Sequence, residues 1–330
     1  MYTRVHTTMC KVVVCSCVLG MLIHANNCNA AQVDRDIALE FDRKITAWKN
    51  YLMNNPRLSN LTGNEHYRAI VDMGIPVLPY LMERIDKGSW ALGGAVCLIT
   101  EKRFEESEWP EGKLGDAISG AGLLREWWPK SRKETPARFS KLYSQWKELR
   151  RQNKKDEVSN KLRQIRNLGL AALPEIMDQI IHGDRELISI VSTLTRGKVD
   201  PNATTDQCVA WWGKNKEKWL IPFPNKQPVA EAGVARNVEA GSTVELDGSK
   251  SADPDKDPLK YRWRQIIGPD VELSDPDAIT PTFTAPDVDR PTMLVFELTV
   301  DDGYRAESVH PTCESGHSKP DTVTITVTPK

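Results

Sequence analysis

The feature that most constrains the fold of this chain is an internal repeat. Residues 67–100 align without a gap with residues 162–195, at a constant shift of 95 positions. Glycines and prolines fall in register together with the apolar positions. The matching pairs include Gly74 and Gly169, Pro79 and Pro174, Met82 and Met177, and Gly88 and Gly183. Self-similarity of this kind indicates a duplicated structural unit.

The sequence pattern of each copy predicts three helices separated by glycine turns. Gly74 and Gly169 stand where the residue after a helix end adopts positive φ. Pro79 and Pro174 then fall in the first turn of the next helix, where a missing N–H is tolerated. In both copies the apolar residues of that helix recur at i, i+3, i+4 and i+7, which predicts a packing face. The pattern resembles HEAT-like α-solenoid repeats, and we expect residues 31–220 to form an α-helical repeat domain of two copies.

An aromatic pair follows each copy, Trp127–Trp128 after the first and Trp211–Trp212 after the second. Exposed tryptophans could serve as stacking platforms for sugars. We favour the alternative that each pair closes the hydrophobic core of its helical unit, because the pairs recur at matched positions.

A proline-rich segment, residues 221–228, interrupts the helical pattern and is interpreted as an extended linker. Beyond it the apolar period changes to two, and residues 229–330 are expected to form a β-sandwich of about seven strands. The predicted strands are 229–232, 243–246, 259–265, 271–273, 282–284, 293–300 and 322–328.

The same region resembles a PKD domain. The resemblance rests on four motifs, PVAEAG at 228–233, GSTVELDGSKSADPDKDPLKYRWRQIIGP at 241–269, TPTFTAP at 280–286 and FELTVDDG at 296–303. It implies an immunoglobulin-like sandwich used outside the cell as a spacer or adhesive module. The sequence departs from the W-D-F-G-D-G version of the family at Trp263-Arg264-Gln265-Ile266, and it carries a long loop at Glu307–Pro320.

The first 30 residues have the pattern of a cleavable export signal. Arg4 and Lys11 precede an apolar stretch at 12–23, and Cys28-Asn29-Ala30 places small residues before a cleavage point. We therefore expect an exported protein with an extracellular, periplasmic or cell-surface location. The chain is not expected to span a membrane unless this signal stays uncleaved.

Alternating carboxylates follow the predicted strand at 243–246, a spacing compatible with calcium. An EF-hand loop is excluded, because Pro258 stands where that loop requires glycine. The alternative is that these side chains cap turns. The calcium candidates are Asp253, Asp255, Asp257, Asp301 and Asp302.

Two further cysteine and histidine arrangements stay open. His310, Cys313 and His317 have a spacing compatible with zinc, but three ligands on a polar loop are typical of an ordinary surface loop. A disulfide between Cys208 and Cys313 is the other arrangement that the sequence allows.

No catalytic motif for hydrolysis, phosphate binding or dinucleotide binding occurs in the sequence. The net charge of −1 gives no reason to expect a nucleic-acid partner. We therefore favour a non-catalytic binding or scaffold protein without a cofactor other than calcium, whose partner is a protein or a polysaccharide at the cell surface. The alternative is a hydrolase, or an accessory protein, that acts on polysaccharide and uses the PKD-like module for targeting.

Overall fold

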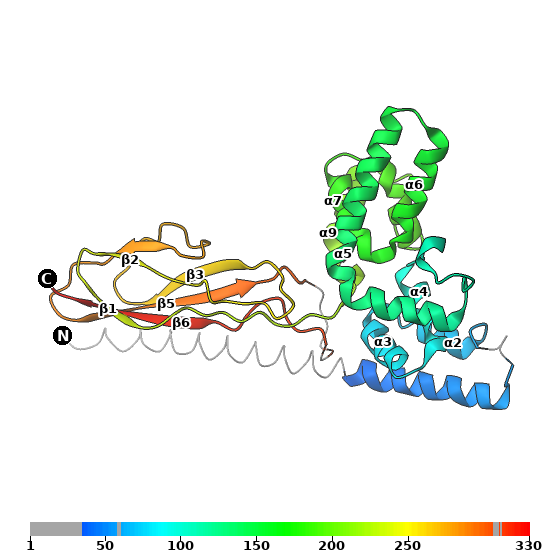
Figure 1. Ribbon diagram of the computed structural model, residues 1–330, viewed down its shortest axis with the longest axis horizontal. Coiled ribbons are helices and arrows are strands. Elements are labelled where there is room, and N and C mark those ends of the chain that lie inside the picture. The colour runs from blue at the N-terminus through cyan, green and yellow to red at the C-terminus, as the bar shows by residue number, and fades with distance from the viewer. Residues whose placement is uncertain (1–34, 58–60, 306–309, 311) are drawn as a thin grey trace, which may run out of the picture. The chain divides into compact units, whose positions relative to one another are not determined.

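The computed structural model describes residues 35–57, 61–305, 310 and 312–330. They form two compact units that divide between Phe223 and Pro224 (Figure 1). We call them the helical unit and the β unit. The predicted export signal lies outside the described residues. Within the described ranges, no helix is long and apolar enough to cross a membrane.

The helical unit consists of α-helices joined by short turns, several of them 3-10 helices. Residues 35–54 are helical. The helices that follow are α2 (Glu65–Val71), α3 (Leu78–Asp86), α4 (Gly93–Thr100), α5 (Ala117–Arg151), α6 (Lys155–Asn167), α7 (Leu173–Ile181), α8 (Ile188–Leu194) and α9 (Thr205–Trp219).

Corresponding segments of the two aligned sequence stretches form corresponding helices in the structure. Helices α3 and α7 are both nine residues long and begin at equivalent positions of the two copies. Gly74 and Gly169, which precede them, both have φ of +74°. The glycine turns and the helices on either side of them are therefore confirmed.

Both copies contribute to one continuous hydrophobic core. The apolar stripes of α3 and α7 point into it, and burying each large aliphatic side chain contributes about 1.5–3 kcal/mol. The stripe residues, all at most 2% exposed, are Leu78, Leu81, Met82 and Ile85 in α3, and Leu173, Ile176, Met177 and Ile180 in α7.

The proline-rich segment 221–228 contributes side chains to each unit. Ile221 and Phe223 are buried in the core of the helical unit. Asn225 is 1% exposed and belongs to the β unit, where its backbone N–H donates to the Thr312 carbonyl. Burial of these side chains restrains both ends of the segment.

The β unit contains two sheets. One has the strand order β1-β6-β5-β3, with β1 parallel to β6 and the other pairs antiparallel; the second pairs β2 with β4. The strands are β1 (Arg236–Glu239), β2 (Thr243–Glu245), β3 (Lys260–Ile267), β4 (Thr282–Thr284), β5 (Thr292–Asp301) and β6 (Asp321–Thr328).

Trp263 anchors the core of the β unit. It lies on β3 opposite Leu298 of β5 and is 2% exposed. Leu298 and Phe296, on the same face of β5, are fully buried beside it. The predicted alternation of core and solvent faces along β3 is therefore confirmed.

The expected strand inventory needs correction, since six strands are described and not seven. Residues 229–232 form only an isolated bridge, from Val229 to Ala252, and residues 271–273 form no strand. Strand β1 was not predicted, because Arg236–Glu239 is mostly polar and exposed. Its strand geometry comes from pairing with the edge of β6.

Candidate functional site

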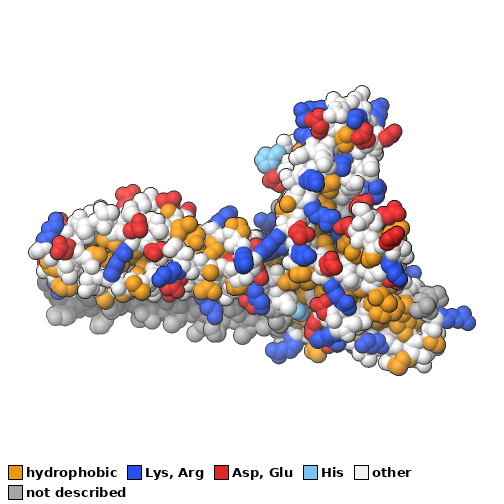
Figure 2. Space-filling model, in the orientation of Figure 1, with side chains coloured by type: hydrophobic (Ala, Val, Ile, Leu, Met, Phe, Trp, Pro, Cys, Tyr) orange, Lys and Arg blue, Asp and Glu red, His pale blue; other side chains and the backbone are white. Residues whose placement is uncertain are grey.

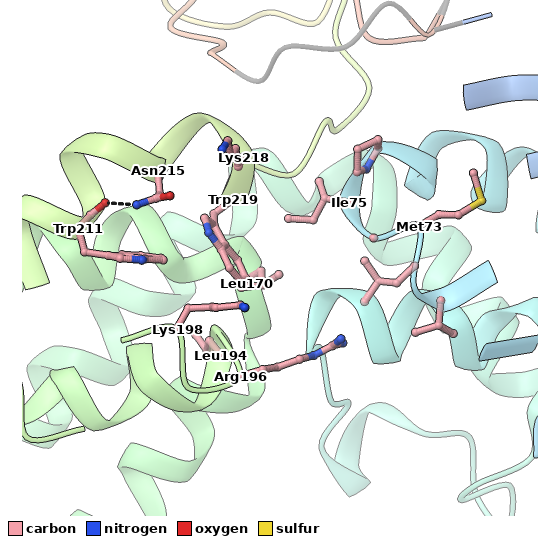
Figure 3. A pocket seen from close by; sticks show the side chains of 14 residues that line it. Met73, Ile75, Leu170, Leu194, Arg196, Lys198, Trp211, Asn215, Lys218 and Trp219 are labelled. Carbon is pink, nitrogen blue, oxygen red and sulfur yellow. Dashed lines mark hydrogen bonds between the residues drawn. The ribbon is translucent and has the colours of Figure 1, made fainter. Parts of the chain in front are cut away.

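A groove of about 510 Å³ lies in the helical unit between the two copies (Figure 3). The first copy contributes apolar side chains around its Gly74 turn, including Met73 and Ile75. The second copy contributes Leu170 from the turn before α7 and Leu194 from the end of α8. We call this cavity the inter-copy groove. Its floor is apolar because apolar side chains from these turns and helix ends line it.

Helix α9 provides one wall of the inter-copy groove. Trp211 and Trp219 line it, with ring centroids 5.8 Å apart, and both rings are partly buried. The Asn215 side-chain amide donates to the Trp211 carbonyl at 2.8 Å, one turn along the helix (Figure 3). The wall therefore presents aromatic surface to the groove.

The two aromatic pairs noted in the sequence differ in the structure. Trp127 and Trp128 are 9% and 5% exposed and contact Phe223, with ring centroids 5.5 and 5.1 Å from it. Their predicted role in core closure is confirmed. Trp211 and Trp212 are only partly buried, so for this pair core closure is incomplete and Trp211 remains available at the groove.

Positive charge surrounds the inter-copy groove. Of its fourteen lining residues three are cationic, Arg196, Lys198 and Lys218, and none is acidic. Arg196 is partly neutralised, since its Nε lies 3.2 Å from Glu101 Oε1 and its guanidinium also donates to the Leu98 carbonyl. Both lysines are exposed. The groove therefore joins an apolar floor to a cationic rim.

The β unit brings three of the five predicted calcium candidates together. Ligand oxygens of Asp253, Asp257 and Asp302 all lie within 4.8 Å of one another. Asp255 instead accepts from the Lys226 backbone N–H at 2.6 Å. Asp301 forms an ion pair with Arg305 at 2.6 Å. We call the first three the Asp cluster.

Asn225 is part of the same region, although the sequence pattern did not indicate it. Its Nδ2 donates to Asp302 Oδ2 at 3.0 Å, and no hydrogen-bond partner for its buried Oδ1 is found among the described residues. Asp253 Oδ2 is likewise buried without one, while Asp253 Oδ1 accepts from the Asp257 N–H. Two buried oxygens without donors are a feature that a hard cation would satisfy.

The zinc and disulfide alternatives gain no support among the described residues. His310 is grouped with the helical unit, whereas Cys313 and His317 belong to the β unit. His317 Nδ1 lies 3.4 Å from Asp301 Oδ2. Cys208 packs against Met177 in the helical core, and no disulfide joins Cys97, Cys208 and Cys313, the cysteines that the structure describes.

Helix α7 carries a buried carboxyl that the sequence did not single out. Glu175 lines a second cavity of about 350 Å³, and within the described part of the chain its buried Oε2 has no hydrogen-bond partner. Burial raises the pKa of Glu175 above its usual value, and nearby Asp178 adds to the rise. The folded state therefore holds this proton to a higher pH than the unfolded state does.

Replacing Glu175 with glutamine is expected to stabilise the helical unit at pH 7, by about 1 kcal/mol. Between the ordinary pKa near 4.5 and the raised folded value, the native state binds more protons than the unfolded state. Wild-type stability therefore falls as pH rises through that window. Urea unfolding should show that Glu175→Gln is more stable than the wild type at pH 7 but not at pH 4. The control Glu217→Gln, at an exposed position of α9, should show no such difference.

Two packed sheets around a buried tryptophan define an immunoglobulin-like β-sandwich. More particularly, residues 232–327 match the family "K319L-like, PKD domain", so this part of the chain is a PKD domain. The predicted resemblance is confirmed.

Among solved structures, the PKD domain from KIAA 1837 protein is 27% identical to this chain. The match covers 31% of this chain and 86% of that one, with a TM-score of 0.24. A nucleoside hydrolase-related hypothetical protein from Saccharophagus degradans, described as associated with carbohydrate metabolism, is 19% identical over 44% of this chain, with a TM-score of 0.25. This chain covers 32% of that protein's length. No curated protein matches the sequence.

Proposed function

We propose that this chain is an exported, non-catalytic binding protein. In this proposal the helical unit is a short HEAT-like repeat array that holds a protein partner, and the PKD domain serves as a spacer or adhesive module. The observation that carries the proposal is the inter-copy groove, an apolar cavity with a cationic rim where the two copies meet. Repeat arrays offer such surfaces because neighbouring copies pack side by side.

Several features support this reading. PKD domains are typical of extracellular proteins, which agrees with the export pattern of residues 1–30. The face drawn in Figure 2 mixes basic and acidic side chains over both units, as on an ordinary protein-binding surface, without the single-sign field typical of nucleic-acid binding. A polysaccharide-acting accessory protein is the second candidate, favoured by the partly exposed Trp211 and Trp219 in the groove.

The test uses the immobilised full chain and a matched variant, Lys198→Glu with Lys218→Glu. Each is exposed to the extracellular protein fraction of the source cells and, separately, to neutral and acidic polysaccharides. We expect proteins to be retained by the wild type and lost by the variant. Retention of polysaccharide alone would favour the second candidate, and the absence of any groove-dependent retention would contradict the proposal. The mass of the exported chain tests cleavage before Ala31.

We further propose that the Asp cluster binds calcium, with Asn225 as an additional oxygen ligand. Extracellular calcium sites have dissociation constants of about 10⁻⁴–10⁻³ M. About 10 mM calcium should therefore stabilise the β unit by about 1.4–2.7 kcal/mol, and a chelator should remove the gain. Asp253→Asn keeps the side-chain shape but removes a charged ligand, and it should abolish the calcium-dependent shift in melting temperature. The control Asp289→Asn, at an exposed position, should keep the shift. An equal shift in both variants would contradict this site.

A further inference from the structure

We infer that the inter-copy groove binds a peptide segment in which a large apolar side chain is flanked by acidic residues. The inference rests on the proposed protein-binding function and names the chemistry of the partner. It follows from three properties of the groove: its apolar floor, the placement of its cations, and its shortage of hydrogen-bond acceptors.

The floor requires an apolar ligand group. Met73, Ile75, Leu170 and Leu194 surround a volume of about 510 Å³, within the usual range for ligand pockets. The Trp211 and Trp219 rings add a wall that a large aliphatic or aromatic side chain can pack against. Burial of such an anchor is the usual source of affinity at a protein–peptide contact.

The cations lie on opposite sides of the Trp219 side chain (Figure 3). In Figure 3, Lys218 is drawn beyond one end of the Trp219 side chain, and Lys198 and Arg196 lie toward the other. Since Arg196 already contacts Glu101, the two exposed lysines are the main charges available to a ligand. A single-headed amphiphile such as a fatty acid offers one carboxylate. A peptide offers carboxylates on both sides of an apolar side chain, which matches the observed placement.

Sugar recognition fits the groove less well. Sugar hydroxyls donate hydrogen bonds and need acceptors, but no carboxylate of a described residue lines the groove. Asn215 Nδ2 donates to the Trp211 carbonyl, and Asn215 Oδ1 is the one side-chain oxygen among the described lining residues. An acidic peptide instead presents acceptors to the lysine ammonium groups, which are donors only.

Charge balance also favours an acidic partner. Residues 1–225 contain 33 Lys and Arg against 26 Asp and Glu, whereas residues 226–330 contain 11 against 19. The chain is nearly neutral as a whole, but the part that holds the groove is basic. A basic groove accelerates association with an acidic segment, and this acceleration weakens as salt is added.

The test selects a displayed library of random peptides against the full chain. The expected result is enrichment of sequences with a large apolar residue between Asp or Glu residues, and loss of this enrichment against the Lys198→Glu, Lys218→Glu variant. Enrichment without an acidic bias, enrichment that persists against the variant, or no enrichment at all would overturn the inference.

Affinities of one selected peptide sharpen the test. Trp219→Ala is expected to weaken binding at least about thirtyfold. Each lysine reversal should weaken it about tenfold and reduce its salt dependence. The control Lys214→Glu lies on the same helix outside the groove and should bind like the wild type. Because both groove lysines are exposed, their variants keep the test valid even if Trp219→Ala fails to fold.

Two outcomes separate this inference from the proposed function. If extracellular proteins are retained through the groove but selected peptides lack the acidic pattern, the peptide chemistry is wrong and protein binding stands. If oligomers of an acidic sugar bind in a Trp219-dependent manner and peptides do not, both this inference and protein binding are overturned in favour of the polysaccharide candidate.

Discussion

Replacing Gly169 with alanine should destabilise the helical unit by roughly 3–5 kcal/mol, an effect large enough to unfold it in part. Gly169 has φ of +74°, which is costly for any residue with a Cβ. A Cβ at this position would lie 2.5 Å from the Thr100 carbonyl oxygen and 2.7 Å from the Lys102 nitrogen. Both neighbours are backbone atoms, so no side chain can rotate away to relieve the clash.

The duplication supplies a matched control, Gly74→Ala. Gly74 has the same φ of +74° and the same place in its copy, but a Cβ there would meet no atom within 4 Å. Only the conformational cost remains, and the expected loss is about 1–3 kcal/mol. Urea unfolding followed by circular dichroism at the helical signal measures both variants. If both variants lost the same free energy of unfolding, the close backbone contact at Gly169 would be contradicted.

Replacing Trp263 with alanine should lower the free energy of unfolding of the β unit by about 3–5 kcal/mol. Trp263 is 2% exposed, and a Cβ on Gly248 would lie only 3.2 Å from its ring, so the site is tightly packed. Removing the ring leaves a cavity between β3 and the backbone around Gly248. The remaining structure can fill it only in part.

Hydrogen exchange read by mass spectrometry can assign this loss to one unit. Protection of the β3, β5 and β6 peptides should fall, while protection of α7 should be unchanged. The control Arg264→Ala changes the adjacent residue on the same strand, whose side chain is 69% exposed and pairs with Glu297. It should cost no more than about 1 kcal/mol. A loss of hydrogen-exchange protection in α7 of the Trp263→Ala variant would contradict the expectation that the two hydrophobic cores respond separately.

Local patterns in the sequence were sufficient where the structure depends on local conformation. The glycine turns follow from the need for positive φ, and α3 and α7 follow from a period that suits one buried helix face. Strands β2 to β6 follow from alternation between a core face and a solvent face. Strand β1 could not be predicted in this way, because its mostly polar residues form a strand only through pairing with β6.

The candidate sites also combine residues that a local sequence pattern reveals with residues that only tertiary contacts bring together. Alternating carboxylates identified the Asp253 region, but the spacing could not show that Asp302 joins Asp253 and Asp257 while Asp255 and Asp301 take other partners. Asn225 was not predicted as a ligand, because a single asparagine in a proline-rich segment forms no recognisable metal-binding pattern. Its role depends on a contact with a residue 77 positions away.

By itself, the sequence determined the duplication, the change from helical to strand periodicity and the PKD character of residues 232–327, because each is repeated or patterned along the chain. Only the tertiary structure decided where the inter-copy groove lies and which side chains line it. The groove combines residues from the Gly74 turn, the end of α8 and helix α9, which are distant in sequence. Such a surface exists only after both copies have packed, since no single segment contains both its apolar floor and its cationic rim.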